Sequence, residues 1–116
     1  MAILEYKDLL VWQKGMDIVE ETYQLTKLLP KEEIYALSNQ MRRAAVSILS
    51  NIAEGQQRKS TKEFANFLSI SRGSVAELET QLYICVRLNY LTAEQVKKSL
   101  DMCAEIGKML NSLIEK

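Results

Sequence analysis

Apolar residues recur at alternating intervals of four and three in four successive segments of the 116-residue chain, and no other feature constrains the fold as strongly. This spacing places side chains on one stripe of an α-helix and is typical of helices that pack side by side. The stripes span residues 11–29, 34–52, 64–85 and 96–114. The sequence therefore predicts an all-α protein, and its length suits one domain over residues 1–116.

Capping residues predict where each helix begins and ends. Asp8 is a fair N-cap, and Pro30 ends the first helix because it removes a backbone donor. Gly55 supplies a stop in the left-handed region, while Ser60 and Thr92 each open a capping box. The expected helices are Asp8–Leu29, Glu32 or Glu33 to Glu54, Ser60–Asn89 and Thr92–Ile114.

The connections between these helices are too short for anything but reversals of direction. Four helices joined in this way predict an antiparallel up-down-up-down bundle, and heptad-like spacing favours shallow left-handed crossings. Gly73 interrupts the third helix at a cost of ~1 kcal/mol relative to alanine. We therefore expect Gly73 to permit the close approach of a neighbouring helix or a ligand.

Histidine is absent from the chain. This absence removes Ser-His and Cys-His catalysis, imidazole metal ligands and the Glu-x-x-His pairs of di-iron bundles. Cys85 and Cys103 lie within apolar helical segments, which favours buried, reduced thiols over a disulfide. We therefore expect a protein that is not an enzyme and that has no cofactor and no metal site.

Fifteen basic residues balance fifteen acidic ones, so the net charge indicates neither nucleic acid nor membrane as a partner. Locally, residues 1–30 carry an acidic excess and residues 31–59 a basic excess. No apolar run approaches the length of a membrane span, and residues 1–5 lack the pattern of a signal peptide. The sequence therefore predicts a cytoplasmic protein without a membrane partner.

A polar stripe runs along the second and third predicted helices, and Arg43 lies on the same face of the second helix as this stripe. It comprises Gln40, Ser47, Asn51, Glu54, Ser74, Glu77 and Gln81. Such a stripe has two interpretations. It is a solvated face or a polar network that fixes the register of the helices, or it is a groove that binds a polymer or a partner. We favour the first interpretation, because charged stripes on amphipathic helices are ordinary.

Basic residues are the candidates for contact with nucleic acid. They are Arg42, Arg43, Arg58, Lys59, Lys62 and Arg72. Phosphate could use these cations together with the free N–H groups at the start of the third helix. The set is dispersed and lacks the interleaved aromatic residues of a single-strand binder.

The first helix carries a second apolar stripe beside the one that faces the core. Its members are Trp12, Met16, Val19 and Tyr23. An isolated bundle does not need this additional apolar surface. The stripe therefore predicts an interface between subunits of a homo-oligomer.

Several motifs carry a resemblance to a known family. They are Val11-Trp12-Gln13, Tyr35-x-Leu37, Gln40-x-Arg42-Arg43-Ala44-Ala45-x-Ser47-Ile48, Asn51-Ile52-Ala53-Glu54-Gly55 and Gly73-Ser74 followed by Glu77-Leu78-Glu79-x-Gln81-Leu82. In this order they resemble the bacterial four-helix-bundle proteins encoded in 23S rRNA intervening sequences. The resemblance covers nearly the whole chain and is most specific over residues 42–55.

This resemblance implies a left-handed up-down bundle and a barrel-like homopentamer. It also implies kinship with the accessory variability determinant of diversity-generating retroelements, which works with a reverse transcriptase and nucleic acid. Two hypotheses follow. The first is an oligomeric accessory protein that associates with structured RNA or DNA, or with a reverse transcriptase or ribonucleoprotein. The second is a protein–protein scaffold without nucleic-acid contact.

Overall fold

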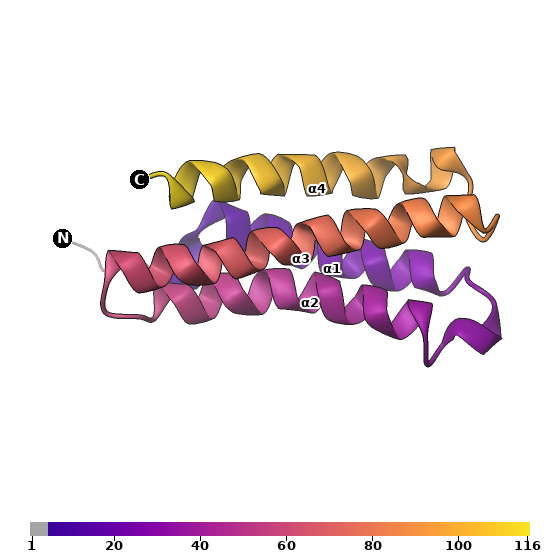
Figure 1. Cartoon of the computed structure of the whole chain (residues 1–116), viewed down its shortest axis with the longest axis horizontal. Coiled ribbons are helices and arrows are strands. Elements are labelled where there is room, and N and C mark those ends of the chain that lie inside the picture. Colours follow the sequence, from indigo (N-terminus) through magenta and orange to yellow (C-terminus); the bar gives the residue numbers. More distant parts are fainter. Residues whose placement is uncertain (1–4) are drawn as a thin grey trace.

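The computed structural model describes residues 5–116, and these form a bundle of four long helices. The helices are α1 (Leu10–Thr26), α2 (Leu37–Gln56), α3 (Thr61–Arg87) and α4 (Ala93–Ile114), with short 3-10 turns at Tyr6–Asp8 and Lys31–Glu33. Successive helices run in opposite directions (Figure 1). The all-α four-helix prediction is confirmed, whereas the left-handed turn of the bundle stays a prediction. Residues 1–4, where the sequence predicts no signal peptide, lie outside the described part.

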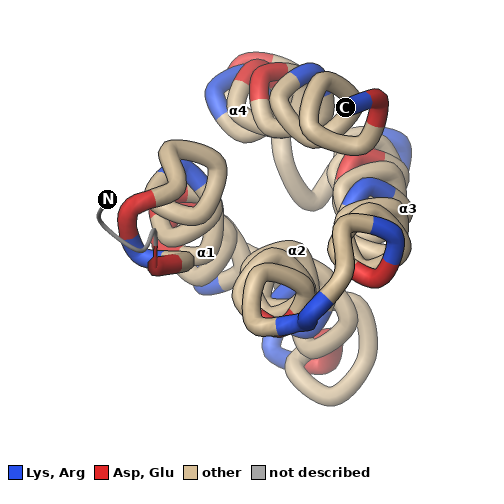
Figure 2. The backbone as a smooth tube through the Cα atoms, turned by 90° about the vertical axis from the view of Figure 1, so that its left-hand side faces the viewer, with Lys and Arg blue, Asp and Glu red and all other residues tan. Residues whose placement is uncertain are grey.

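The four apolar stripes meet in one core. Viewed along the bundle, the helices follow the order α1, α2, α3, α4 around the core (Figure 2). The predicted stripe of α1 is buried at Val11, Ile18 and Leu25, and the stripes of the other helices are buried in the same way. The main stripes therefore predicted the core correctly.

The boundaries of α1 differ from the expected ones. Asp8 belongs to the preceding 3-10 turn, where its carboxylate accepts from the backbone N–H of Glu5, and Leu9 is the N-cap of α1. At the other end, α1 stops at Thr26, and the chain continues as a turn as far as Leu29. The helix ends before the proline because i→i+3 bonds already tighten the chain there.

The start of α2 lies several residues beyond the expected Glu32 or Glu33. One carboxylate oxygen of Glu33 accepts from the backbone N–H of Leu37 at 3.2 Å, which satisfies a free donor at the start of α2. The other oxygen accepts from the hydroxyl of Tyr90 at 2.9 Å. Glu33 thereby joins the α1–α2 connection to the turn between α3 and α4, a tertiary contact that local propensity could not predict.

Gly55 does not end α2 in the left-handed region, so that prediction is wrong. It is a buried residue inside the helix, which continues to Gln56. A Cβ atom at Gly55 would lie 2.6 Å from Cβ of Phe67 and 3.1 Å from Cδ1 of Phe64. Close packing of α3, rather than backbone conformation, therefore requires glycine here.

The caps of α3 and α4 follow the prediction closely. Ser60 accepts from the N–H of Glu63, although the return bond of a capping box is absent, and Thr92 forms the full box with Gln95. α3 ends at Arg87, two residues earlier than expected. Asn89 adopts a positive φ of 63°, and the N–H of the next residue bonds five residues back, the arrangement of a Schellman cap.

Gly73 contradicts the expectation of close packing. It lies on the exposed face of α3, and apart from its chain neighbours and the local helix backbone, no atom of residues 5–116 lies within 4 Å of the position that its Cβ would occupy. The close approaches occur instead at Gly15 against Leu49, at Gly55, and at Gly107 against Arg72. The prediction was wrong because a glycine inside a helix does not by itself indicate close packing. Position 73 is two residues from both Ser71 and Val75, so the apolar stripe of the third helix already leaves it on the opposite face.

Candidate functional site

The polar stripe lies along the contact between α2 and α3. The hydroxyl oxygens of Ser47 and Ser74 are 2.8 Å apart, and Asn51 donates to both the carbonyl and the hydroxyl of Ser47. Gln81 is only 5% exposed, with its Nε2 3.5 Å from Glu77. The centre of the stripe is therefore an inter-helix network, whereas its outer members Gln40, Glu54 and Glu77 are exposed.

The six basic candidates do not form one patch. Arg58, Lys59 and Lys62 are exposed where α2 passes into α3, the end that faces the viewer in Figure 2. Arg58 pairs with Glu54 at 2.8 Å, and its guanidinium lies 4.6 Å from the centre of the Phe67 ring. Lys59 and Lys62 form no ion pair within the described chain.

The other arginines lie elsewhere. Arg42 is about 20 Å along α2 from its last residue, Gln56, at ~1.5 Å per residue. Its Nε donates to Thr26 at 2.8 Å, and its guanidinium lies over the Tyr23 ring at 4.6 Å. Arg43 is exposed on α2, whereas Arg72 packs between α3 and α4 against Gly107. The sequence already indicated a dispersed set, but it could not reveal which neighbour each arginine contacts.

The second stripe of α1 remains partly uncovered. Met16 is 42% exposed and Tyr23 is 39% exposed, whereas Trp12 and Val19 are half-buried. More apolar surface lies in the connection between α1 and α2, where Tyr35 is 91% exposed. These residues are available for contact with another chain, as the interface hypothesis requires.

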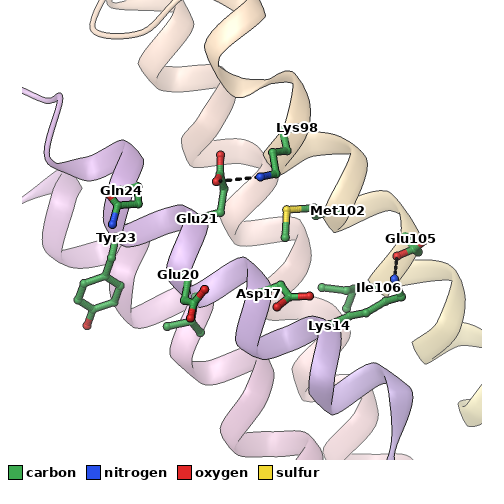
Figure 3. Close-up of a pocket in the computed structure, with 11 residues that line it drawn as sticks. Lys14, Asp17, Glu20, Glu21, Tyr23, Gln24, Lys98, Met102, Glu105 and Ile106 are labelled. Atoms are coloured by element: carbon green, nitrogen blue, oxygen red, sulfur yellow. Dashed lines mark ion pairs between the residues drawn. The ribbon is translucent and has the colours of Figure 1, made fainter.

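A groove between α1 and α4 is the feature that sequence reasoning missed. Its volume is about 820 Å³, and side chains from both helices line it (Figure 3). Two ion pairs cross the groove, Lys14–Glu105 at 2.6 Å and Lys98–Glu21 at 3.7 Å. The hydrogen bond and the charge of Glu105 raise the pKa of Lys14. The acidic excess of residues 1–30 was the one signal that could have indicated this groove.

A comparison with protein families identifies the group to which this bundle is related. The family described as 23S rRNA-intervening sequence protein matches residues 7–112. The chain belongs to this family. The resemblance stated from the sequence motifs is therefore confirmed.

A solved structure agrees with this family membership. It is the 1.70 Å crystal structure of a protein with unknown function from the S23 ribosomal protein family of Bacteroides thetaiotaomicron VPI-5482. The two chains share 30% sequence identity with a TM-score of 0.85, over 92% of this chain and 100% of that one. Among proteins with curated functions, none matches this chain. The comparisons thus establish the family and the fold.

Reactive groups in this member of the 23S rRNA-intervening sequence family are few. Residues 5–116 hold no cluster of three His, Cys, Asp or Glu side chains that could bind a metal ion. None of the helices described in residues 5–116 is both long and apolar enough to cross a membrane. Cys85 and Cys103 are free and buried, as predicted. Burial raises the pKa of Cys85 to about 11 and that of Cys103 to about 12.

These thiols should be inert in the native protein. At pH 8, a pKa of about 11 leaves roughly one Cys85 in a thousand as thiolate, the reactive species, and Cys103 with a pKa of about 12 has fewer still. We expect no reaction with an aromatic disulfide reagent over minutes at pH 8, and rapid reaction of both thiols in denaturant. Fast labelling of the folded protein would contradict the burial of both side chains.

Proposed function

We propose that this chain is a non-enzymatic, cytoplasmic accessory protein that assembles into a ring, a pentamer as the family resemblance implies, and associates with RNA or DNA. The observation that supports nucleic-acid contact is the exposure of Arg58, Lys59 and Lys62 at one end of the bundle. The start of α3, with its N-terminal dipole, lies at the same end. Cations beside a helix N-terminus suit a phosphate backbone.

One copy offers too little charge to bind a polymer tightly, because Glu54 already pairs with Arg58. A ring would present the same end several times, and linked weak sites gain through effective concentration. The partly exposed Met16 and Tyr23 supply apolar surface for such an assembly. A reverse transcriptase or another ribonucleoprotein component fits as the partner that shares the nucleic acid.

Charge reversal at the α2–α3 end tests this proposal. We expect Arg58→Glu/Lys59→Glu to weaken binding to labelled single-stranded RNA and DNA at low salt by about tenfold or more, because phosphate contacts and the counterion release that accompanies them are lost. The dependence of the binding constant on salt should decrease as well. The matched control is Lys27→Glu/Lys31→Glu, which makes the same charge change at exposed positions of the α1–α2 connection. Fluorescence anisotropy measures binding, and light scattering checks that wild type and both variants remain oligomers.

Two results would remove the proposal. Equal weakening by both variants would show that only net charge matters, and no binding by wild type at low salt would exclude the polymer as a partner. A monomer at micromolar concentration would overturn the ring. The protein–protein scaffold would then be the better function, and the nearly complete exposure of Tyr35 is the observation that favours it.

A further inference from the structure

We propose that the groove between α1 and α4 is a docking site for a basic, amphipathic helix of a partner protein. The inference rests on the groove's shape and charge and does not depend on nucleic-acid binding at the α2–α3 end. A groove between two antiparallel helices can receive a third helix, whose apolar side chains at positions i, i+3, i+4 and i+7 enter it. With a volume of about 820 Å³, the groove can accept several such side chains.

The floor of the groove is apolar. Met102 and Ile106 of α4 line it; Met102 keeps part of its surface accessible, whereas Ile106 is only 1% exposed. Figure 3 shows Met102 and Ile106 in the interval between the two ion pairs. A second, separate apolar hollow lies near the start of α1, where Leu10 and Met109 are among the residues that line it. The contact between α1 and α4 thus offers apolar surface along much of its length.

The rim of the groove is acidic. Its lining includes four carboxylates, on Asp17, Glu20, Glu21 and Glu105, against the two cations of Lys14 and Lys98. The two ion pairs use both lysines together with Glu21 and Glu105. Asp17 and Glu20 therefore remain without an ion-pair partner among the described residues. Because like charges repel and opposite charges attract, these carboxylates disfavour an acidic occupant and favour one that carries Lys or Arg beside its apolar face.

The chain's own basic loop is a poorer occupant. Residues 57–62 carry three cations but no large apolar side chain. They could pair with the carboxylates of the rim but would leave the apolar floor unfilled. A helix with leucines on one face and lysines along its edges can fill the apolar floor and pair with the carboxylates of the rim. The chemistry of the groove therefore favours a different protein with a basic amphipathic segment over a second copy of this chain.

A synthetic peptide tests the inference. The probe is a fluorescein-labelled helical peptide of about 18 residues, long enough to span ~27 Å, with leucines on one face and lysines on its flanks. Fluorescence anisotropy should show saturable binding to wild type that weakens with added salt. The acidic analogue, with glutamate in place of each lysine, should not bind.

Substitutions in the groove provide the decisive comparison. Asp17→Asn/Glu20→Gln should raise the Kd of the basic peptide about fivefold to tenfold, since two partly exposed charge contacts are lost. Met102→Lys should weaken binding further, because it places a cation on the apolar floor. The matched control, Glu32→Gln/Glu115→Gln, removes two exposed carboxylates elsewhere and should leave the Kd unchanged.

The result that supports the inference is loss of binding in the groove variants alone, with NMR shift changes confined to α1 and α4. No binding to wild type, or equal weakening by the control, would overturn it. Concentration-dependent protection of α4 around Met102 from hydrogen exchange without peptide would also overturn it and identify a second copy as the occupant, whereas protection confined to α1 is what the proposed ring predicts. Arg58→Glu/Lys59→Glu should still bind the peptide, which separates this test from that of the proposed function.

Discussion

Ile48→Ala should lower the free energy of unfolding by about 2–5 kcal/mol, because it deletes buried methyl and methylene groups and leaves a cavity. Ile48 is fully buried in α2, and its carbonyl oxygen accepts a hydrogen bond from the buried hydroxyl of Ser71 in α3 at 2.7 Å. The backbone around Ile48 is therefore fixed by α3 and can collapse little into the cavity. Urea unfolding followed by circular dichroism measures the change, at one fixed protein concentration because self-assembly adds stability.

Val46→Ala is the matched control for this measurement. Val46 lies two residues before Ile48 on the same helix but is 40% exposed. Its truncation should change the free energy of unfolding by no more than about 0.5 kcal/mol in the monomeric bundle. A loss at Val46 as large as that at Ile48 would mean that the outer face of α2 is covered in the assembled protein.

Gly55→Leu should destabilise the bundle by about 3 kcal/mol or prevent its folding, because the new side chain overlaps α3. The nearest atom to its Cβ would be Cβ of Phe67, only 2.6 Å away, and a Cβ atom cannot move without its backbone. The higher helix propensity of leucine returns less than about 1 kcal/mol, so steric overlap decides the sign.

Gly73→Leu is the control, with the opposite expected sign. Gly73 faces open space, so leucine there should stabilise α3 by about 0.5–1 kcal/mol through helix propensity alone. Thermal or urea unfolding of both variants gives the comparison. A destabilised Gly73→Leu protein that also loses its assembly would show that a neighbouring subunit covers this face.

Most of the fold could be predicted from the sequence because the apolar period and the burial of side chains have the same physical cause. Met41, Leu78 and Cys103 are buried where their stripes predicted. The errors fall where a distant contact overrides local preference. Before the late start of α2, Glu33 bonds to Tyr90, 57 residues away, and Gly55 lies inside α2 where Phe67 leaves no room for a side chain.

The candidate site was less predictable, because it depends on side-chain direction and on helix pairing. The sequence grouped Arg42 with Arg58, yet one side chain contacts Thr26 and the other pairs with Glu54. The contact of Ser47 with Ser74 follows from the shared face that the stripe predicted. The groove went unnoticed because its two walls come from the two ends of the sequence, and only the folded chain brings them together.

The pairing of α1 with α4 also bears on how the chain folds. Every other neighbouring pair of helices is consecutive in sequence and is joined by at most the ten residues 27–36, which favours rapid folding. Only α1 and α4 must meet across the whole intervening chain, so their contact carries the largest loss of chain entropy. This contact should consequently form late in folding and open first in local unfolding. The amides of α1 and α4 that line the groove should therefore be less protected from hydrogen exchange than those of α2 and α3.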